Sequence, residues 1–249
     1  FSPQWMISFN INFLHQGEKN NNIMRLLIVA ATPYEILPLQ QYLEANFEQT
    51  EEHLFTKGGL QIQILITGVG QMLTAFALGN ILNHQSFDLL LNAGVAGAFD
   101  RNLKLGEVVN VVSERFGDLG AEDQDGSFID IHELGLIENN AAPFENGTLA
   151  NPTVIQFDFL FNVKALTINK VHGSEDSISA IQKKYSDVQI ESMEGAAFFY
   201  AALMTDIPFL QIRSISNYVE ARNREAWELG LAIEKLNQVL VEMIEGFGE

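Results

Sequence analysis

Short apolar runs alternate with helical periods along most of the chain, and this alternation limits the fold more than any other feature. Residues 25–31 (RLLIVAA) are continuously apolar after Arg25, as strands of a buried parallel sheet are, and residues 33–46 follow with a helical pattern. The same order recurs, with strands expected at 60–67, 88–92, 107–112, 164–169, 188–192 and 208–214 and helices at 68–83, 175–185, 194–204 and 225–245. This pattern predicts an α/β fold of three layers, a twisted mixed sheet flanked by helices.

We expect one domain over residues 24–249, because no repeat, linker or change of composition divides it. Residues 113–152 are rich in Gly, Asn, Asp and Glu, and we expect a long irregular segment there. Residues 1–23 lack a basic start, a continuous apolar segment and a small-residue cleavage site, so they do not form a secretory signal. We interpret them as an N-terminal extension without ordered structure.

The charge and cysteine content exclude several functional classes. Lys and Arg total 14 against 32 Asp and Glu, a net charge of −18, so nucleic acid and anionic membranes are poor partners. The absence of cysteine excludes thiolate nucleophiles and Cys-ligated metals, and the scattered histidines do not support a metal site. No apolar run approaches the roughly 20 residues that cross a bilayer. We therefore expect a soluble, cytoplasmic protein that acts on a small molecule.

Two glycine-rich segments follow expected strands. Gly68-Val69-Gly70 begins like a dinucleotide fingerprint, but Leu73 stands where the third glycine is needed. Gly94 and Val95 lie in the second segment, residues 93–97 (AGVAG). Both segments are explained as tight turns between strand and helix. The alternative is that their backbone N–H groups approach a ligand at the carboxyl ends of the strands.

Two glutamates are candidates for chemistry, and each also has a structural explanation. Glu35 follows the first strand and completes a capping box with Thr32 at the N-cap and Pro33 at N1; its alternative role is a carboxylate that faces the crevice. Glu194 precedes eleven uncharged residues, so its burial requires a partner. It is either a carboxylate satisfied at a helix start or part of a site.

The last expected strand ends in polar residues. Arg213, two serines and Asn217 follow one another closely, which suits a recognition site, although turn chemistry explains the serines and Asn217 nearly as well. Arg222 and Arg224 stand out in a chain so poor in cations. A salt bridge to one of the many acidic residues is the simpler role for each, and binding of an anionic ligand is the alternative.

Taken together, these segments resemble the nucleoside phosphorylase and nucleosidase superfamily over essentially all of residues 24–249. The matching pieces are LLIVAATPYE, TGVG, LNAGVAGAF with LKLGEVV, IESMEGAA, and PFLQIRSISN. Within it the sequence is most similar to futalosine hydrolases, with methylthioadenosine/adenosylhomocysteine nucleosidases as near relatives. ESMEGAA followed by IRSISN is the specific part of the resemblance, because the glycine turns occur in many folds.

The resemblance implies roles for individual residues. Glu35 falls where the attacking water is positioned, with Arg213 close to that water, while Met193 and Glu194 fall where the ribose is held. Asn217 falls where the purine is gripped, and Val171 and His172 in the segment that lines the base. Arg222 and Arg224 are candidates for binding a carboxylate on the 5′ group of the substrate.

The sequence departs from the family at three places. Asn217 replaces the Asp of adenine-specific nucleosidases, Val95 stands where a Ser is usual, and residues 113–152 do not align clearly. Because an amide can donate to O6 of hypoxanthine, Asn217 suits a 6-oxopurine, although a flipped amide also serves adenine.

The resemblance implies hydrolysis of the N-glycosidic bond of futalosine, which releases hypoxanthine in menaquinone biosynthesis. It implies no metal or organic cofactor, and we also expect a homodimer. Phosphorolysis of inosine-like nucleosides and adenine-directed nucleosidase activity are alternatives on the same fold. A protein that binds a nucleoside without cleaving it is a further one.

Overall fold

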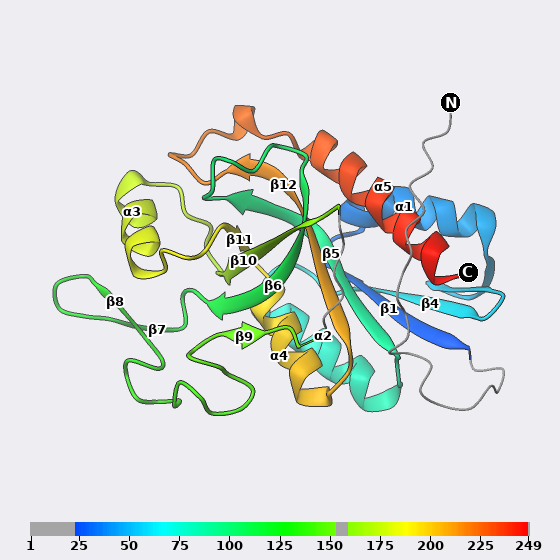
Figure 1. Ribbon diagram of the computed structural model, residues 1–249, viewed down its shortest axis with the longest axis horizontal. Helices are drawn as coiled ribbons and strands as arrows, with labels where there is room; N and C mark the ends of the chain where they lie inside the picture. The colour runs from blue at the N-terminus through cyan, green and yellow to red at the C-terminus, as the bar shows by residue number, and fades with distance from the viewer. Residues whose placement is uncertain (1–22, 153–158, 249) are drawn as a thin grey trace.

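A large mixed sheet with helices on both faces forms the body of the protein (Figure 1). The computed structural model describes residues 23–152 and 159–248. Apart from Ile23, the N-terminal extension expected from the sequence lies outside the described residues. The sheet contains, in spatial order, β11 (Ile190–Ser192), β10 (Phe161–Thr167), β6 (Val108–Phe116), β12 (Phe209–Tyr218), β5 (Leu89–Ala98), β1 (Met24–Ala30), β4 (Leu60–Ile66), β3 (Leu54–Lys57) and β2 (Glu48–Glu51), with β9 (Leu149–Ala150) paired to β6.

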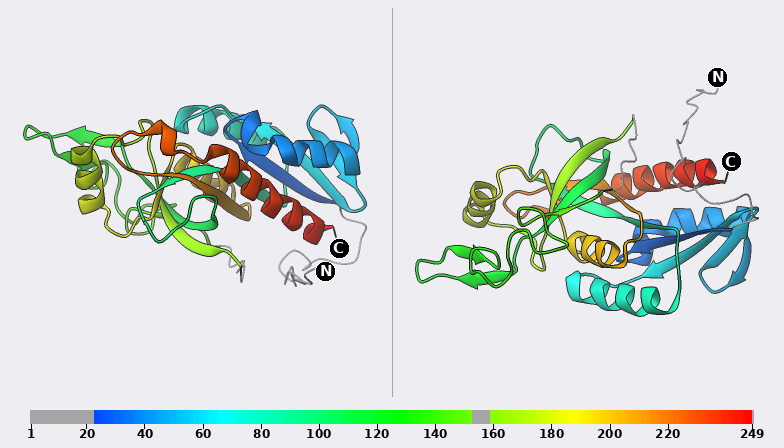
Figure 2. Two further views of the ribbon diagram at one scale, coloured as in Figure 1. Left: turned by 90° about the horizontal axis from the view of Figure 1, so that it is seen from above. Right: turned by 60° about the horizontal axis from the view of Figure 1, so that its bottom comes forward.

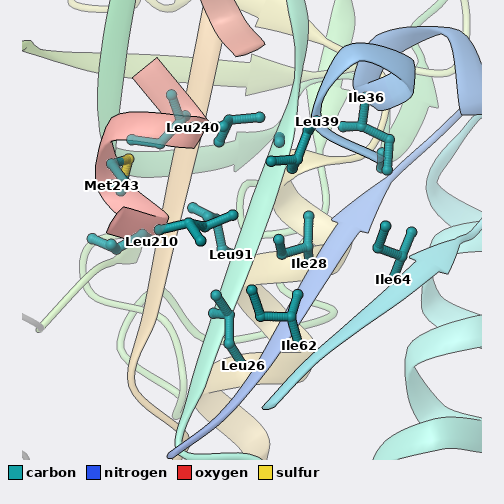
Figure 3. Close-up of a cluster of buried hydrophobic side chains, with 14 of the residues drawn as sticks. Leu26, Ile28, Ile36, Leu39, Ile62, Ile64, Leu91, Leu210, Leu240 and Met243 are labelled. Atoms are coloured by element: carbon teal, nitrogen blue, oxygen red, sulfur yellow. The ribbon is translucent and has the colours of Figure 1, made fainter. Parts of the chain in front are cut away.

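Both faces of strand β1 are buried, which explains why its sequence is apolar from Leu26 onward. Leu26 and Ile28 join the core cluster that includes residues of α1 (Pro33–Asn46) and α5 (Leu229–Phe247), which Figure 3 shows in close-up. Leu27 and Val29 point to the opposite face, in the cluster that includes residues of α2 (Gln71–His84) and α4 (Gly195–Thr205). Figure 2 shows these two helix pairs on opposite sides of the sheet. The predicted three-layer α/β architecture is therefore confirmed.

The strand directions gather the candidate segments at one edge of the sheet. Strand β1 runs parallel to β4 and β5, and β12 runs parallel to β5. Glu35, the glycine turn after β4 and the polar end of β12 therefore all follow the carboxyl ends of strands at the same edge of the sheet.

A second feature of the sheet was not predicted. Strand β11 pairs with both β10 and β5, so that β5, β12, β6, β10 and β11 form a closed circuit.

Two predicted turns are strands instead. Gly94 and Gly97 lie inside β5, paired with Arg213 and Asn217 of β12, so residues 93–97 do not form a turn and β12 continues to Tyr218. Each strand continues because its neighbour supplies backbone partners where the sequence loses its apolar character. The glycine turn at residues 68–70 is confirmed, with positive φ angles of 85° at Gly68 and 100° at Gly70.

Other boundaries also differ from the prediction. Strand β6 extends to Phe116, and residues 117–152 contain the hairpin of β7 (Gly120–Glu122) and β8 (Phe128–Asp130) as well as β9. Helix α3 (Glu175–Lys184) is close to its expected range, whereas α5 starts at Leu229 after a 3-10 turn at Arg224–Ala226. The β2–β3 hairpin was missed because all four β2 side chains are exposed and polar, which leaves no alternation to detect. None of the described helices is long and apolar enough to cross a membrane.

Candidate active site

Glu35 uses its two carboxylate oxygens for different purposes. Oε2 accepts the backbone N–H of Thr32 at 3.0 Å and the Thr32 hydroxyl at 3.1 Å, so the predicted capping interaction is present. Oε1 points the other way and accepts the backbone N–H of Val95 in β5 at 3.1 Å. The cap therefore holds the carboxylate in place and leaves one oxygen over the end of β5.

The side chains of Arg213 and Glu35 both lie next to Gly94. A Cβ atom built on Gly94 would lie 2.7 Å from Glu35 Oε1 and 3.1 Å from Arg213 Nη1, so a larger residue there would displace both side chains. The Arg213 side chain is 1% exposed and donates from Nη1 to Asn92 Oδ1 at 3.3 Å. Its Nε has no hydrogen-bond partner among the described residues. A buried guanidinium with a free donor next to a carboxylate is suited to hold a polar ligand.

Glu194 belongs to the same cluster. It precedes α4, yet its side chain does not cap that helix; Oε1 accepts the backbone N–H of Gly70 at 3.0 Å instead. The residue is 8% exposed, and this burial raises the pKa of the Glu194 carboxyl. The positive charge of Arg213 and the Gly70 hydrogen bond oppose the shift, while the negative charge of Glu35 adds to it. The two carboxylates and Arg213 are therefore electrostatically coupled.

Asn217 lies near the end of β12, at a β-bulge between Ile215 and Asn217. Its Nδ2 donates to the Tyr218 carbonyl at 3.0 Å, and its Oδ1 accepts the Ser216 hydroxyl at 2.9 Å. These bonds fix the amide orientation and still leave one N–H and one lone pair for a ligand.

The remaining residues that the resemblance implied are Met193, Val171 and His172. Met193 is partly buried and directly precedes Glu194. Val171 packs at the border of a small core cluster. The ring of the adjacent His172 contacts Glu191, which the sequence analysis did not single out.

The contacts of Arg222 and Arg224 differ from the salt bridges that were the simpler expectation. Neither forms a salt bridge to an acidic side chain within the described ranges. Both guanidinium groups stack on Trp227 instead, at 5.8 and 5.9 Å from the ring centroid. The exposed Arg222 also approaches the segment that carries His172, because its backbone N–H donates to the Gly173 carbonyl at 3.1 Å. A cation held by an aromatic ring keeps its N–H donors available.

A buried polar network lies behind the cluster, and the sequence analysis missed it. Glu114 of β6 is 0% exposed, and its oxygens accept from Gln211 at 2.6 Å and from the Thr167 hydroxyl at 2.8 Å. Gln211 in turn accepts from Asn92, to which Arg213 donates. The network thus connects the buried Glu114 to Arg213 through Gln211 and Asn92. Burial raises the pKa of Glu114 to about 7, although both hydrogen bonds act in the opposite direction.

The raised pKa of Glu114 predicts a pH dependence of stability. The folded protein binds a proton on Glu114 more tightly than the unfolded chain, so the contribution of Glu114 to stability is fully present below about pH 4.5 and is lost as the pH rises to about 7. At about 1.4 kcal/mol per pKa unit, the loss is about 3 kcal/mol. Urea unfolding at pH 5 and pH 8 measures it. Glu114→Gln should reduce the difference between the two pH values, and an unchanged difference would show that Glu114 does not cause it.

Two residues near the cluster were missed, and one of them carried a signal that could have been used. Glu191 lies within a strand that the sequence predicted, and a charged residue in a buried strand is unusual enough to be noticed. Glu114 was assigned to an irregular segment because the apolar run of β6 ends before it.

The described part of the chain contains no group of three or more His, Cys, Asp or Glu side chains that could hold a metal ion.

Similar proteins were found by sequence and by structure. The chain is 30% identical over 206 residues to the 5′-methylthioadenosine/S-adenosylhomocysteine nucleosidase of Maridesulfovibrio salexigens, which covers 79% of this chain and 87% of that protein. It is 29% identical over 166 residues to the futalosine hydrolase of Streptomyces coelicolor, covering 64% of this chain and 66% of the relative. No family model matches the sequence.

The solved structures agree on the fold. A 5′-methylthioadenosine/S-adenosylhomocysteine nucleosidase from S. pneumoniae, bound to a transition-state inhibitor, aligns with a TM-score of 0.73 and 22% identity, over 90% of this chain and all of that one (100%). The corresponding enzyme from Colwellia psychrerythraea, in complex with adenine, aligns with a TM-score of 0.73 and 22% identity over 92% of this chain and 98% of that one.

These similarities and the fold together define the class: the protein is a hydrolase that acts on N-glycosyl bonds of nucleosides. More particularly, the chain belongs to the nucleoside phosphorylase and nucleosidase superfamily, in which methylthioadenosine/adenosylhomocysteine nucleosidases and futalosine hydrolases are its homologues.

Proposed function

We propose that the protein hydrolyses the N-glycosidic bond of futalosine, a 6-oxopurine nucleoside, and releases hypoxanthine and dehypoxanthine futalosine in menaquinone biosynthesis. The observation that carries this proposal is Asn217, whose anchored amide keeps one N–H and one lone pair for the base. Hypoxanthine offers an acceptor at O6 and a protonated N7 as the bond breaks, so a donor and an acceptor side by side are complementary to it.

The charges around Glu35 favour water over phosphate as the nucleophile. Glu35 Oε1 accepts the Val95 N–H, a donor that an incoming phosphate could otherwise use. A carboxylate at this point repels a phosphate anion but accepts a proton from water. In our proposal Glu35 is the general base and Arg213 orients the attacking water.

The ribose would lie between Glu35 and Glu194. Cleavage of a ribosyl C–N bond places positive charge on the sugar and negative charge on the departing base. A fixed carboxylate that faces the cationic sugar stabilises this distribution without reorganisation during the reaction. Glu194, already oriented by the Gly70 N–H, would bind the ribose hydroxyls in this role, with Met193 packed against the sugar.

One assay tests the reaction and the substrate together. The protein is incubated with futalosine, inosine and methylthioadenosine, each with and without phosphate, and the free base is quantified. We expect phosphate-independent release of hypoxanthine, fastest from futalosine. Turnover that requires phosphate would contradict hydrolysis, and faster release of adenine would contradict the proposed substrate.

An adenine-directed nucleosidase is the second candidate. It is favoured by the relative with 30% identity, a methylthioadenosine/adenosylhomocysteine nucleosidase. An Asn amide that flips by 180° presents an acceptor to the 6-amino group of adenine, so Asn217 permits this substrate. The bond to the Tyr218 carbonyl opposes that flip, because it would then join two acceptors, whereas the Ser216 hydroxyl can donate or accept.

Asn217→Asp is expected to reduce or reverse the preference for hypoxanthine over adenine. An ionised Asp offers only acceptors and repels O6, whereas a protonated Asp donates to N7 and accepts from the amino group of adenine. Mismatched buried polar groups cost about 1–3 kcal/mol, which corresponds to a change of about ten- to hundredfold. The measurement is the ratio of kcat/KM for futalosine and aminofutalosine in both proteins. An unchanged ratio would remove Asn217 as the residue that reads the base.

Arg222 and Arg224 are proposed to bind the carboxylate of the 5′ group. Their guanidinium groups keep donors available while stacked on Trp227, and they are rare cations in a chain of net charge −18. We expect Arg222→Ala or Arg224→Ala to raise the KM for futalosine about tenfold or more, since charge-assisted hydrogen bonds contribute about 1.5–3 kcal/mol. Inosine, which lacks that carboxylate, serves as the control substrate; equal losses for both substrates would assign the arginine a general structural role.

We also propose that the protein is a homodimer through the face formed by α2 and α4. Met72, Phe76, Tyr200 and Met204 are exposed there, and Met72, Tyr200 and Met204 line a groove between the two helices. Two copies with a net charge of −18 repel each other, but neither helix carries an Asp, Glu, Lys or Arg. A second copy is therefore the partner that this face suits. Sedimentation equilibrium tests it, with a mass of twice the chain as the expected result and a monomer as the contrary one.

A further inference from the structure

A buried carboxylate that the proposed reaction leaves unused lies beside Asn217. Glu191 of β11 is 4% exposed and pairs with Gly97 of β5, whose other neighbour in the sheet is Asn217 of β12. A Cβ atom built on Gly97 would lie 3.1 Å from Asn217 Nδ2 and 3.7 Å from Glu191 Cγ. The two side chains therefore lie over the same glycine, and Glu191 belongs to the end of the site that would receive the base.

Both oxygens of Glu191 contact one residue, His172. The backbone N–H of His172 donates to Oε1 at 3.2 Å, and its ring Nδ1 lies 2.6 Å from Oε2. Because an ionised carboxylate only accepts, Nδ1 carries a proton and Nε2 faces away from the pair. The ring is 14% exposed and packs on Phe99 with 6.2 Å between centroids. Within residues 23–152 and 159–248, Nε2 has no hydrogen-bond partner.

The chemistry requires an acid at this end of the site. When the C–N bond breaks, its electron pair moves to the base, which then needs a proton on a ring nitrogen. Asn217 can donate a hydrogen bond but cannot give up a proton, since an amide is not an acid. Glu35, at the other end, receives a proton from water. Glu191 lies beside Asn217 over Gly97, and His172 is bonded to Glu191; an imidazolium can give up a proton from Nε2 while Nδ1 stays bonded to the carboxylate.

We propose that His172, held in place by the Glu191 carboxylate, donates the proton to the departing purine. In this step the C1′–N9 bond breaks with both electrons going to the base, and the imidazolium Nε2–H passes its proton to a ring nitrogen of the base. Water forms the new C1′–O bond and gives its proton to Glu35. His172 then regains a proton from solvent and Glu35 releases one, so the net reaction is the addition of water across the glycosidic bond. His172 is the catalytic residue of this step, and Glu191 is a positioning residue.

This inference rests on the proposed hydrolysis and on the proposed place of the base at Asn217. Its test compares two leaving groups in one protein. A purine needs a proton when it leaves, whereas the nitrophenolate of p-nitrophenyl β-D-ribofuranoside leaves as a stable anion. His172→Gln keeps a polar side chain of similar size but cannot transfer a proton. We expect the variant to lower kcat/KM for the purine nucleoside about 10²–10⁴-fold, the usual contribution of a general acid. For the nitrophenyl riboside we expect a change of less than about tenfold. Equal losses on both substrates would overturn the proposal and assign His172 a packing role.

Glu191→Gln provides a second variant with its own readout. The His172 ring contacts Glu191 and Phe99, and the neighbouring Gly173 accepts the backbone N–H of Arg222. Glu191→Gln replaces the carboxylate that accepts both His172 N–H groups by a neutral amide, so we expect kcat/KM for the purine nucleoside to fall at least about tenfold more than kcat/KM for the nitrophenyl riboside. Equal losses on the two substrates would contradict the role of Glu191.

Failure of the proposed substrate can be told apart from failure of the acid. The wild-type protein is first assayed on futalosine and methylthioadenosine, and the faster of the two becomes the purine substrate of the comparison. A preference for methylthioadenosine contradicts the futalosine proposal, and the leaving-group comparison still decides the role of His172.

Discussion

Glu35→Gln is expected to lower hydrolysis at least about 100-fold while the protein remains folded, because Gln keeps the shape of the side chain and loses its basicity. The structure also predicts a stability cost. One carboxylate oxygen accepts two donors from Thr32 and the other accepts the Val95 N–H, and an amide NH2 group must face one of these donors. We therefore expect a loss of about 1 kcal/mol, the usual value of a helix cap. Steady-state kinetics and thermal melting measure the two effects.

Thr32→Ala is the matched control for this variant. It removes one hydroxyl that donates to Glu35 Oε2 and leaves both the carboxylate and the Thr32 backbone N–H in place. Its stability should fall by a similar amount, with an activity loss much smaller than that of Glu35→Gln. If Glu35→Gln melts at a lower temperature but turns over at nearly the normal rate, Glu35 is a helix cap only.

The sequence was sufficient for the elements whose pattern is local. The strand at Met24–Ala30, the helix at Pro33–Asn46 and the glycine turn before Gln71 all follow from apolar periodicity and capping chemistry. The polar continuations of β5 and β12 did not, because Gly94, Gly97, Arg213 and Asn217 remain in strands only through pairing between distant segments. Local composition there is that of a turn, and tertiary pairing overrides it.

The candidate site shows the same division. Glu35 and Glu194 could be chosen from their own neighbourhoods, since each is a carboxylate with an identifiable helix start. Glu191 could be noticed as a charge in a buried strand, but its partner His172 could not be predicted. Glu114 could not be chosen at all, because its partners Gln211 and Thr167 are far away in the chain. The salt bridges expected for Arg222 and Arg224 were wrong for a related reason. The aromatic ring of Trp227, a few residues further on, competes with acids for the guanidinium groups, and the sequence offers no measure of that competition.

Glu194→Gln is expected to lower kcat about 10²–10³-fold with a smaller change in KM, since a charge that faces the cationic sugar acts mainly in the transition state. The Gln carbonyl can still accept the Gly70 N–H, and burial already raises the pKa of the Glu194 carboxyl. A neutral side chain removes this unfavourable buried charge, so the melting temperature at pH 8 should stay the same or rise. Loss of activity without loss of stability separates a catalytic carboxylate from one that only supports the fold.

The substrate provides the complementary test of Glu194. If its carboxylate binds the ribose hydroxyls, removal of the 2′-hydroxyl from the substrate should cost the wild-type protein more than it costs Glu194→Gln, because the variant has already lost most of that interaction. The measurement is a double cycle of kcat/KM for a purine ribonucleoside and its 2′-deoxy analogue in both proteins. Equal sensitivity to the missing hydroxyl would show that Glu194 and the ribose do not interact. The raised pKa would then reflect the proximity of Glu194 to Glu35 and its burial alone.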